Sequence, residues 1–531
     1  MQTLIVAGLF VATAIAQSNT VPGLDARLSY AGDPVYYGRR GAAHPGGEVA
    51  IMFSYYMCNT GTIDVPWTAP MNPEHPMFGF TVVREKNGRL EQMTNQATTF
   101  AKHAFGAENV QRDCGPCALT GTGLRVGCSD AYSANTNSNR YYLAPQSEID
   151  PWTGIWEPVG SYFDRGEPDV GTPANSDGSR SLLNGASGVF ADQVRNRVTL
   201  REQDLLAADK LFVAMHMVLR GEDGDAHFNN LGRRRANMTW NGGTWVVSNA
   251  AQPYQQGSVL HEWTGASVTS ARNGEDDGHF FVAVKVTANG NGTWHYEYAL
   301  QNFDNARGGA SFRIPLCPSV QVTGVTFRDV DQDLLNEWSW SRVGSELVFS
   351  APLANPLDWN TMFNFGFDCD QAPVGGDVVV DQARLGAGAL SVTIATQVPS
   401  GIAAVTSLGA GCGNPAPSIT VQGLPTLPNP GFGIELVTEP HSQSLLFLSA
   451  QQDNVVLAPG CTQFLMDASL QTIGFYVADG SGITQVSIPL PLDPAFDGVR
   501  LYWQAAQLQS GGPVFGEFAV SNGTAVRFGC R

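Results

Sequence analysis

Apolar and polar residues alternate most regularly between residues 166 and 397, which is the pattern of strands with one buried face. The clearest strand covers 211–219, where every second residue is apolar and shares one face: Leu211, Val213, Met215, Met217 and Leu219. Two further apolar stretches, 280–286 and 293–301, flank the Gly- and Asn-rich segment 288–292. This arrangement predicts a β-hairpin.

The second arm of this hairpin has two different faces. One face carries large apolar side chains, namely Trp294, Tyr296, Tyr298 and Leu300. The opposite face carries His295 and Glu297. Further strands are expected at 309–316, 319–327, 345–350, 361–367 and 389–396. Many short strands separated by turns predict an antiparallel β-sandwich over 166–397.

The regions on either side differ in regularity. Residues 17–165 are rich in Pro, Gly, Asn and aromatic residues, which predicts a cysteine-rich region of loops and short strands. Residues 398–409 are small and weakly polar and favour a linker. Residues 410–531 hold enough short strands for one compact sandwich of roughly 100 residues. The sequence thus predicts a mainly β, multi-domain protein of antiparallel sandwiches with a loop-rich, disulfide-stapled N-terminal region.

The N-terminus predicts export. Residues 1–16 are uncharged and mostly apolar, and they end in Ala14-Ile15-Ala16. A short apolar run closed by small residues is typical of a signal peptide, here cleaved before Gln17. No later segment has about 18 consecutive apolar residues, so no transmembrane segment is expected. The protein is therefore predicted to act outside the cell or at its surface.

Charge narrows the range of partners. Acidic residues outnumber basic ones by 48 to 30, which gives a net charge of −18. A chain this acidic is not a general nucleic-acid binder, because it repels the phosphate backbone. Only 15% of residues are charged, and lysine occurs at four positions alone, 86, 102, 210 and 285. Scarce lysine also argues against a helical protein.

All nine cysteines follow the predicted cleavage point, and an oxidising destination favours disulfides. They form three groups along the chain, of which the first is Cys58, Cys114, Cys117 and Cys128. The second is Cys317 with Cys369, and the third is Cys412 with Cys461. Pairing within each group is the simplest scheme. It leaves Cys530 free or available to link two chains.

Two other chemistries compete for the first group. Cys114-Gly-Pro-Cys117 has the spacing of zinc ligands, with Cys128 and His103 nearby in sequence. The same motif resembles a redox pair. A zinc ribbon needs a second close pair and a thioredoxin-like motif needs a βαβ setting, and neither is found. Structural disulfides are therefore the preferred interpretation.

A set of short motifs is spread along the chain. They are Cys58-Asn59-Thr60-Gly61, Pro66-Trp67, His75-Pro76, Gly88-Arg89-Leu90-Glu91-Gln92, Lys102-His103-Ala104-Phe105, the C-G-P-C, Gly127-Cys128-Ser129-Asp130-Ala131-Tyr132, Tyr296-Glu297-Tyr298-Ala299, Ser311-Phe312-Arg313-Ile314-Pro315, Asn364-Phe365-Gly366-Phe367-Asp368, Gly411-Cys412-Gly413, Pro459-Gly460-Cys461 and Ser521-Asn522-Gly523-Thr524. Together they resemble an uncharacterised family of large secreted modular bacterial proteins, and the Gly-Cys-Ser-Asp stretch is the most specific. The resemblance implies secretion, β architecture and a Cys412–Cys461 pairing. It transfers no catalytic residues.

An enzyme would most plausibly use the first region. His75 or His103 beside Asp130 would serve general acid–base chemistry, and Ser129 would be a nucleophile. Ser129-Asp130 next to a disulfide cysteine is equally well explained as a turn that caps a loop. A glycosidase pair of carboxylates has no fixed sequence spacing, so it stays an open alternative.

An acidic loop and two tryptophans offer a binding site. Asp329, Asp331 and Asp333 place carboxylates at alternate positions, as in calcium loops, although the Gly and Glu of an EF-hand are missing. A solvated acidic loop is the preferred interpretation, and structural calcium the alternative. Trp338 and Trp340 follow directly and would stack on sugar rings if both were exposed.

These observations favour a secreted, non-catalytic protein that binds cell envelope or polysaccharide. A secreted hydrolase acting on polysaccharide is the second hypothesis. A structural envelope component, with Cys530 linking chains, is the third. The sequence names no ligand and no cofactor beyond the calcium alternative.

Overall fold

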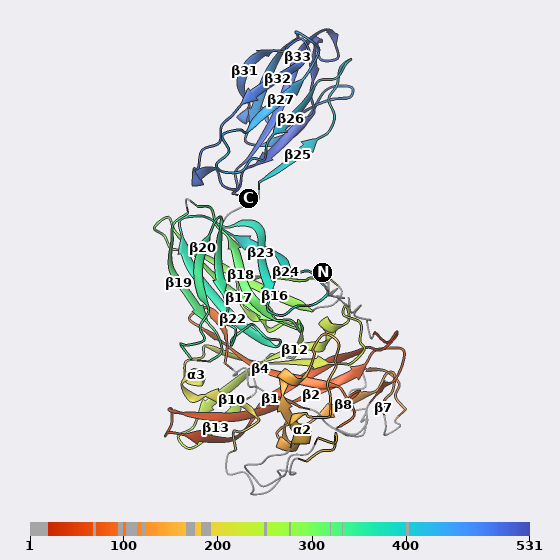
Figure 1. The fold of residues 1–531 in the computed structure, drawn as a ribbon, viewed down its shortest axis with the longest axis vertical. Coiled ribbons are helices and arrows are strands. Elements are labelled where there is room, and N and C mark those ends of the chain that lie inside the picture. The colour runs from red at the N-terminus through yellow and green to blue at the C-terminus, as the bar shows by residue number, and fades with distance from the viewer. Residues whose placement is uncertain are drawn as a thin grey trace, which may run out of the picture.

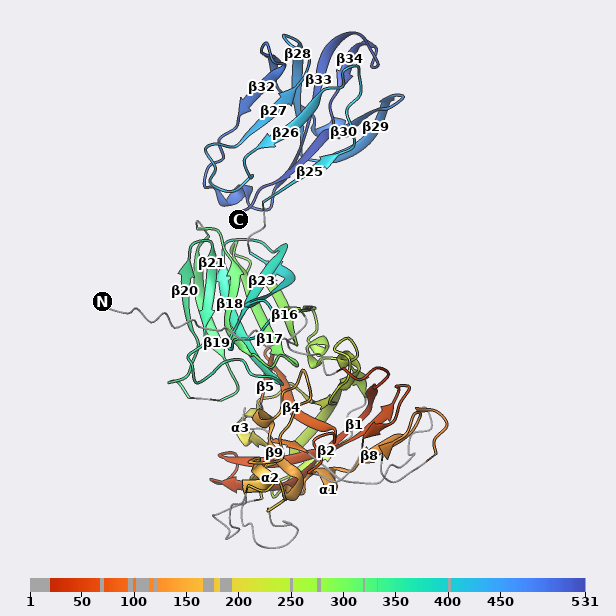
Figure 2. The same cartoon turned by 45° about the vertical axis from the view of Figure 1, so that its right-hand side comes forward.

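A computed structural model describes residues 20–530, except 67–70, 94–98, 102–113, 119–122, 166–175, 182–192, 249–251, 275–277, 319, 332 and 400–402. It is 52% strand and 7% helix, so the predicted mainly β class with several antiparallel sheets is confirmed. The chain forms three parts stacked along its long axis (Figure 1), with the C-terminal module at one end. Figure 2 shows the same order from another side. Among the described residues, no helix has the length and apolar character to cross a membrane.

The first part is built from two large sheets with a shared apolar core. One sheet contains β1 (Ala26–Gly41), β2 (Gly47–Asn59), β10 (Val198–Arg201) and β8 (Ser129–Tyr132). The other contains β13 (Trp245–Ser248), β12 (Leu231–Trp240), β11 (Lys210–Val218), β4 (Met77–Lys86), β6 (Thr99–Ala101) and β9 (Leu143–Pro145), with β14 (Gln255–Gln256) and β5 (Arg89–Gln92) at its edges. A small pair, β3 (Val65–Pro66) and β7 (Gly123–Leu124), and the short helices α1 (Ala134–Asn137), α2 (Tyr162–Arg165) and α3 (Glu202–Leu206) complete it.

The expected boundary at residue 165 does not separate two domains. β10 is hydrogen-bonded to β2, and β11 to β4, so strands on both sides of residue 165 share sheets. The change in sequence regularity marks where long loops give way to regular strands. It does not mark where one hydrophobic core ends, because β11 fills the centre of a sheet begun by β4.

The second part is a sandwich of two five-stranded antiparallel sheets. One contains β15 (Ser267–Arg272), β16 (His279–Ala288), β17 (Trp294–Asn302), β22 (Thr361–Cys369) and β19 (Val322–Arg328). The other contains β20 (Ser339–Val343), β21 (Glu346–Ser350), β18 (Gly309–Pro315), β23 (Val374–Gln382) and β24 (Ser391–Val398). The predicted hairpin is present as β16–β17, and Tyr296, Tyr298 and Leu300 are buried in the core.

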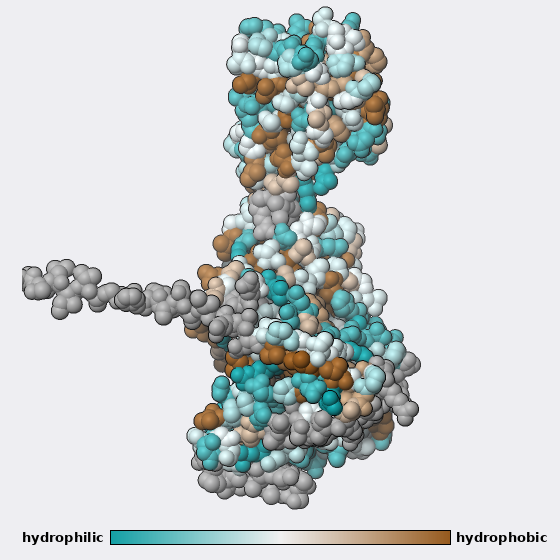
Figure 3. All heavy atoms as spheres, turned by 90° about the vertical axis from the view of Figure 1, so that its right-hand side faces the viewer, coloured by the Kyte–Doolittle hydropathy of each residue, from teal (hydrophilic) through white to brown (hydrophobic). Residues whose placement is uncertain are grey.

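The first part and the sandwich are joined by a core of their own. Leu90 and Phe212 from the first part pack with Phe281, Ala299 and Met362 on the outer face of the sandwich sheet. Burial of this apolar surface holds the two parts together, because separating them would expose it to water. Seen from the side (Figure 3), hydrophobic residues also gather at the surface close to this junction.

The third part begins earlier than expected. β25 (Ala404–Leu408) lies inside the segment expected to be a linker, but it pairs with β35 (Gly523–Arg527). The same sheet holds β33 (Arg500–Gly512), β28 (Gln443–Ser449), β31 (Gln471–Val477) and β34 (Gly516–Val520). The facing strands are β26 (Ser418–Gln422), β27 (Gly433–Val437) and β32 (Ile483–Ser487), beside the hairpin of β29 (Gln452–Ala458) and β30 (Cys461–Leu465).

Four disulfides are present: Cys58–Cys114, Cys117–Cys128, Cys317–Cys530 and Cys412–Cys461. Disulfides in this number indicate an extracellular protein. The last pair is the one that the family resemblance implies. The two cysteines of the C-G-P-C stretch belong to separate disulfides, so the stretch is neither a zinc site nor a redox pair.

The expected Cys317–Cys369 pair is wrong. Cys317 is bonded to Cys530, which therefore neither stays free nor links two chains. Cys369 is a buried free thiol. It lies on β22 opposite Trp294 and Val322, inside the sandwich. Grouping by sequence fails here because the C-terminal module returns its last residues to the sandwich, 213 positions after Cys317.

Thiol titration of the denatured, unreduced protein tests this pairing. We expect one thiol in the wild type, from Cys369, and two in Cys530→Ser, which stays monomeric on a non-reducing gel. Pairing of Cys317 with Cys369 would instead leave no thiol in Cys530→Ser. With Cys317 bonded to Cys530, the matched variant Cys369→Ser should give no thiol.

Candidate functional site

The first part and the sandwich enclose a cleft of about 720 Å³ at the tip of the β4–β5 hairpin. The hairpin lines it with Lys86, Asn87, Gly88, Arg89 and Glu91. Strands β16, β17 and β19 line it with Lys285, Thr287, His295, Glu297 and Arg328. Polar residues that are far apart in the sequence therefore meet at one surface hollow.

The hairpin tip has a fixed shape. Its two turn residues, Asn87 and Gly88, have φ values of 52° and 79°, which Asn and Gly tolerate better than other residues. The buried indole of Trp263 donates a hydrogen bond to the Gly88 carbonyl at 2.7 Å. The Asn87 N–H donates to the Asp209 carboxylate at 2.7 Å. The charged side chains beside the turn are thus carried on a rigid support.

The sandwich side of the cleft continues the sheet face that packs against the first part. Alternate residues of a strand share a face, so Phe281 and Ala283 lie on the same side of β16 as Lys285. Phe281 and Ala283 are buried in the core that joins the first part to the sandwich. Lys285 lies just beyond the edge of this core, at the cleft. His295 and Glu297, the polar face noticed in the sequence, occupy the same position on β17.

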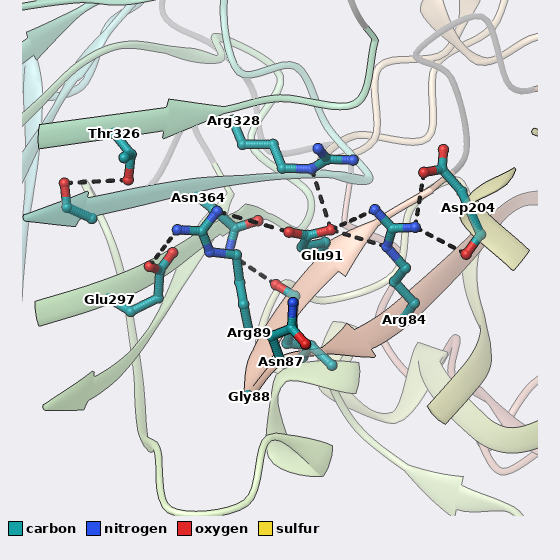
Figure 4. A network of polar contacts seen from close by, with 12 residues as sticks. Arg84, Asn87, Gly88, Arg89, Glu91, Asp204, Glu297, Thr326, Arg328 and Asn364 are labelled. Atoms are coloured by element: carbon teal, nitrogen blue, oxygen red, sulfur yellow. Dashed lines mark hydrogen bonds and ion pairs between the residues drawn. The ribbon is translucent and has the colours of Figure 1, made fainter. Parts of the chain in front are cut away.

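A chain of ion pairs runs from the cleft into the first part (Figure 4). Arg84 binds Glu91 at 2.9 Å and Asp204 at 2.8 Å, and its side chain is 2% exposed. Arg328 lies 3.3 Å from the same Glu91 carboxylate. The two ends of this series of ion pairs belong to different parts of the protein. The ion pairs therefore fix the two parts relative to each other and also place charged side chains in the cleft.

A second group of ion pairs surrounds Glu297. Arg89 donates to its Oε2 at 2.8 Å across the junction. The ring of His295 lies between Glu297, at 3.3 Å, and Asp368, at 2.8 Å. Hydrogen bonding to Glu297 and then to Asp368 raises the pKa of His295, against the effect of burial. A β-carbon at Gly366 would lie 2.7 Å from Glu297, so glycine leaves the room that this carboxylate occupies.

The cleft has an excess of positive charge and one unused acceptor. Four cations line it against two carboxylates, and two of the protein's four lysines are among them. Among the described residues, neither the Lys86 nor the Lys285 ammonium forms an ion pair, and Lys285 contacts only the Gly88 carbonyl, at 3.4 Å. Oε1 of Glu297 is buried with no hydrogen-bond partner. Such a site suits a ligand with both an anionic group and a hydroxyl donor.

The residues expected for catalysis lie elsewhere. His75, Ser129 and Asp130 are buried in the first part, and His103 lies outside the described residues. A ring nitrogen of His75 lies 2.7 Å from the Pro76 carbonyl, and Asp130 accepts the N–H of the next residue at 2.8 Å. With these side chains packed in the interior, a polymeric substrate does not reach them.

The two tryptophans do not form a joint platform. Trp338 is buried, stacks on Phe327 and donates its indole N–H to the Asn355 carbonyl at 2.8 Å. Trp340 is 52% exposed. Residues two apart share a face only within a strand, and β20 begins at Ser339, after Trp338.

The acidic loop uses its carboxylates on its own backbone. Asp329, Asp331 and Asp333 each accept the N–H two residues further on, as in Asx turns. Asp329 also accepts from Asn355, and burial raises its pKa. The three carboxylates do not converge closely enough to share one ion among the described residues, and calcium binding here stays a prediction.

Comparison with known proteins adds little. No protein-family model and no curated protein sequence matches the chain, so the family resemblance stays a prediction. Among solved structures, the Bacillus cereus major pilin subunit BcpA is 7% identical, with a TM-score of 0.16 over 59% of this chain and 77% of the pilin. Elastase-activated Escherichia coli alpha-2-macroglobulin is 10% identical, with a TM-score of 0.14 over 95% of this chain and 35% of its own length. Scores this low carry no argument.

Sequence reasoning missed this cleft although two signals pointed to it. His295 and Glu297 alternate with the core residues Tyr296 and Tyr298, so they share the outer face of β17. Lysine is rare in this chain, so the position of each lysine suggests a specific role. The sequence did not reveal that the turn after Lys86 would meet that face.

Arg84 is expected to be essential for the alignment of the junction. Arg84→Met would remove the buried cation that Glu91 and Asp204 share and leave them with Arg328 and Arg201, which costs about 1.5–3 kcal/mol of unfolding free energy. Denaturant unfolding measures this loss. Arg40→Met, which removes an exposed pair with Glu48, is the control and should cost about 1 kcal/mol or less. Equal effects of the two substitutions would contradict the assigned role.

Outside the cleft, one buried carboxyl group couples stability to pH. Glu222 accepts the Ala26 N–H at 3.0 Å and a hydrogen bond from the Asn230 amide. Burial raises its pKa from 4.5 to about 8. The folded protein favours the neutral form, because burial disfavours the charged one.

Unfolding free energy should therefore fall as the pH rises. The contribution of neutral Glu222 is fully present below about pH 4.5 and is lost as the pH passes through the folded pKa of about 8. Glu222→Gln should remove this component from stability curves measured between about pH 5 and about pH 9. The exposed neighbour Asp223→Asn is the control. A Glu222→Gln curve that parallels the wild type would refute the assignment.

Proposed function

We propose that this extracellular protein is a non-catalytic binding protein that holds polysaccharide of an envelope or matrix in the cleft between its first two parts. The observation that carries the proposal is the pair of unneutralised lysine ammonium groups beside a buried, unused acceptor on Glu297. Sugars offer the hydroxyl donors that such an acceptor needs. The rigid hairpin tip supports binding, since little conformational freedom is lost when a ligand docks.

The ion pairs favour binding over hydrolysis. A typical glycosidase needs two carboxyl groups, one of which is protonated and donates to the leaving oxygen. In this cleft Glu91 contacts Arg84 and Arg328, and Glu297 contacts Arg89, so guanidinium groups engage both carboxyl groups. This arrangement differs from that of a typical glycosidase, in which one carboxyl group faces the leaving oxygen as its proton donor.

A polysaccharide hydrolase is the second candidate, and His295 is the observation that favours it. A histidine between two carboxylates with a raised pKa can donate a proton near neutral pH. The structural envelope component loses its main support, because Cys530 is bonded within the chain.

A depletion assay distinguishes these functions. Purified mature protein is mixed with envelopes of the producing cell and with insoluble neutral and acidic polysaccharides. We expect the protein to leave solution with no release of soluble sugar. Thr287→Trp, which fills the cleft, should abolish depletion, whereas Thr406→Trp on exposed β25 should not.

Three results would count against this function. Released sugar that disappears in His295→Ala would establish the hydrolase instead. Absence of depletion by every polymer and by envelopes would refute binding altogether. Depletion that survives Thr287→Trp would place the binding site elsewhere.

A further inference from the structure

We infer that the sugar recognised in this cleft is an acidic one, whose anionic group is bound by Lys86 and Lys285 and whose neighbouring hydroxyl is bound by Glu297. The inference rests on the proposed function and specifies its ligand class. The anionic group is a carboxylate or a sulfate ester, since both are planar or compact acceptors that an ammonium binds.

The first argument is the placement of charge. In a chain of net charge −18, lysine is the scarcest charged residue, yet two of four lysines lie at one cleft. Lys210 shows the alternative use, because its ammonium is neutralised by Glu85 at 2.6 Å. A neutral sugar would gain only hydrogen bonds from two unpaired ammonium groups, whereas an anion gains both the hydrogen bonds and the attraction between opposite charges.

The second argument is the position of the ammonium groups. Lys86 precedes the rigid turn, and Lys285 reaches it from β16, where its ammonium lies 3.4 Å from the Gly88 carbonyl. Both lysines are partly buried. Lysine side chains in such positions commonly pack their stems on the protein and keep the ammonium toward water. An anionic group seated by the turn is thus approached by a lysine from each part of the protein.

The third argument excludes a bare anion. Oε1 of Glu297 is buried and has no partner, while Arg89 occupies Oε2. A sulfate dianion offers no donor for this oxygen, and the carboxylate would repel any bare dianion, hydrogen phosphate included. A sugar ring supplies a hydroxyl next to its acid group, so it satisfies the lysines and Glu297 together.

The fourth argument concerns calcium. Acidic polysaccharides are often held through a shared metal ion, but the cations that face this cleft are side chains of the protein. Arg89, Arg328 and the two lysines outnumber Glu91 and Glu297. Binding should therefore persist with a chelator, and it should weaken as salt screens the charges.

The test uses the mature full-length protein and polymers that differ in one group. Polygalacturonate is compared with its fully methyl-esterified form, which keeps the ring hydroxyls and loses the charge. Dextran sulfate is compared with dextran, and poly-glutamate offers carboxylates without sugar rings. Affinities are measured by biolayer interferometry at two salt concentrations, with and without chelator.

We expect one or both charged sugar polymers to bind, while the neutral forms and poly-glutamate bind at least about tenfold more weakly. Which charged polymer binds identifies the group as carboxylate or sulfate. Lys86→Gln and Lys285→Gln should each weaken binding about tenfold. Lys210→Gln, at the lysine already paired with Glu85, should bind like the wild type. Thermal melts verify that each variant is folded.

Four outcomes would overturn the inference. Equal binding of charged and neutral polymers would leave polysaccharide binding intact but refute the acidic ligand. Poly-glutamate binding as tight as that of the sugar polymers would make the ligand an acidic polypeptide. Loss of affinity in Lys210→Gln equal to that in the two cleft variants would show a general effect of charge. Failure of every polymer to bind would refute the acidic ligand, and failure of the envelopes as well would refute the proposed function itself.

Discussion

The β4–β5 hairpin packed on the outer face of β16, β17 and β22 is the contact on which the rest of the arrangement depends. Its apolar half buries Leu90 against Met362 and Ala299, and its polar half joins Arg84, Glu91 and Arg328. The amide of Asn364 adds a hydrogen bond to the Leu90 carbonyl at 2.9 Å. Without this contact the core that joins the two parts would lose Leu90, and the cleft beside the turn would not exist.

This contact also explains the unusual sheet face. A strand in an isolated sandwich exposes its outer side to water and is polar there. On β16 and β17 the outer side is apolar at Phe281 and Ala299, because the first part of the protein packs on it there. It is polar at Lys285 and Glu297, because the first part no longer packs on it at these positions. The transition between the two halves marks the edge of the junction. The candidate site lies along that edge.

Local patterns in the sequence predicted the class and the strand faces well. The alternation around Tyr296 and Tyr298 predicted which residues would enter the core of the sandwich, since alternation of side chains is a property of the strand itself. The boundary at 165 failed, because pairing of β2 with β10 joins strands separated by long loops. The Cys317–Cys369 pair failed for the same reason: contacts between distant segments are set by the fold as a whole.

The candidate site shows the same division. His295 and Glu297 were noticed as a polar face, but the turn that completes their cleft is 208 positions from Glu297 at Arg89. Trp338 illustrates the opposite error, in which an alternation rule was applied one residue before its strand began. Single residues that carry chemistry are therefore harder to predict here than the elements that hold them.

The way in which the C-terminal module is attached limits how it can move. A module joined by one stretch of chain can swivel about that point in every direction. This module is joined to the sandwich a second time by the Cys317–Cys530 bond, and Arg527 donates to the Gly375 carbonyl at 2.9 Å. A second covalent link shortens the distance over which the two bodies can separate. It therefore restricts the set of orientations that the module can take relative to the sandwich.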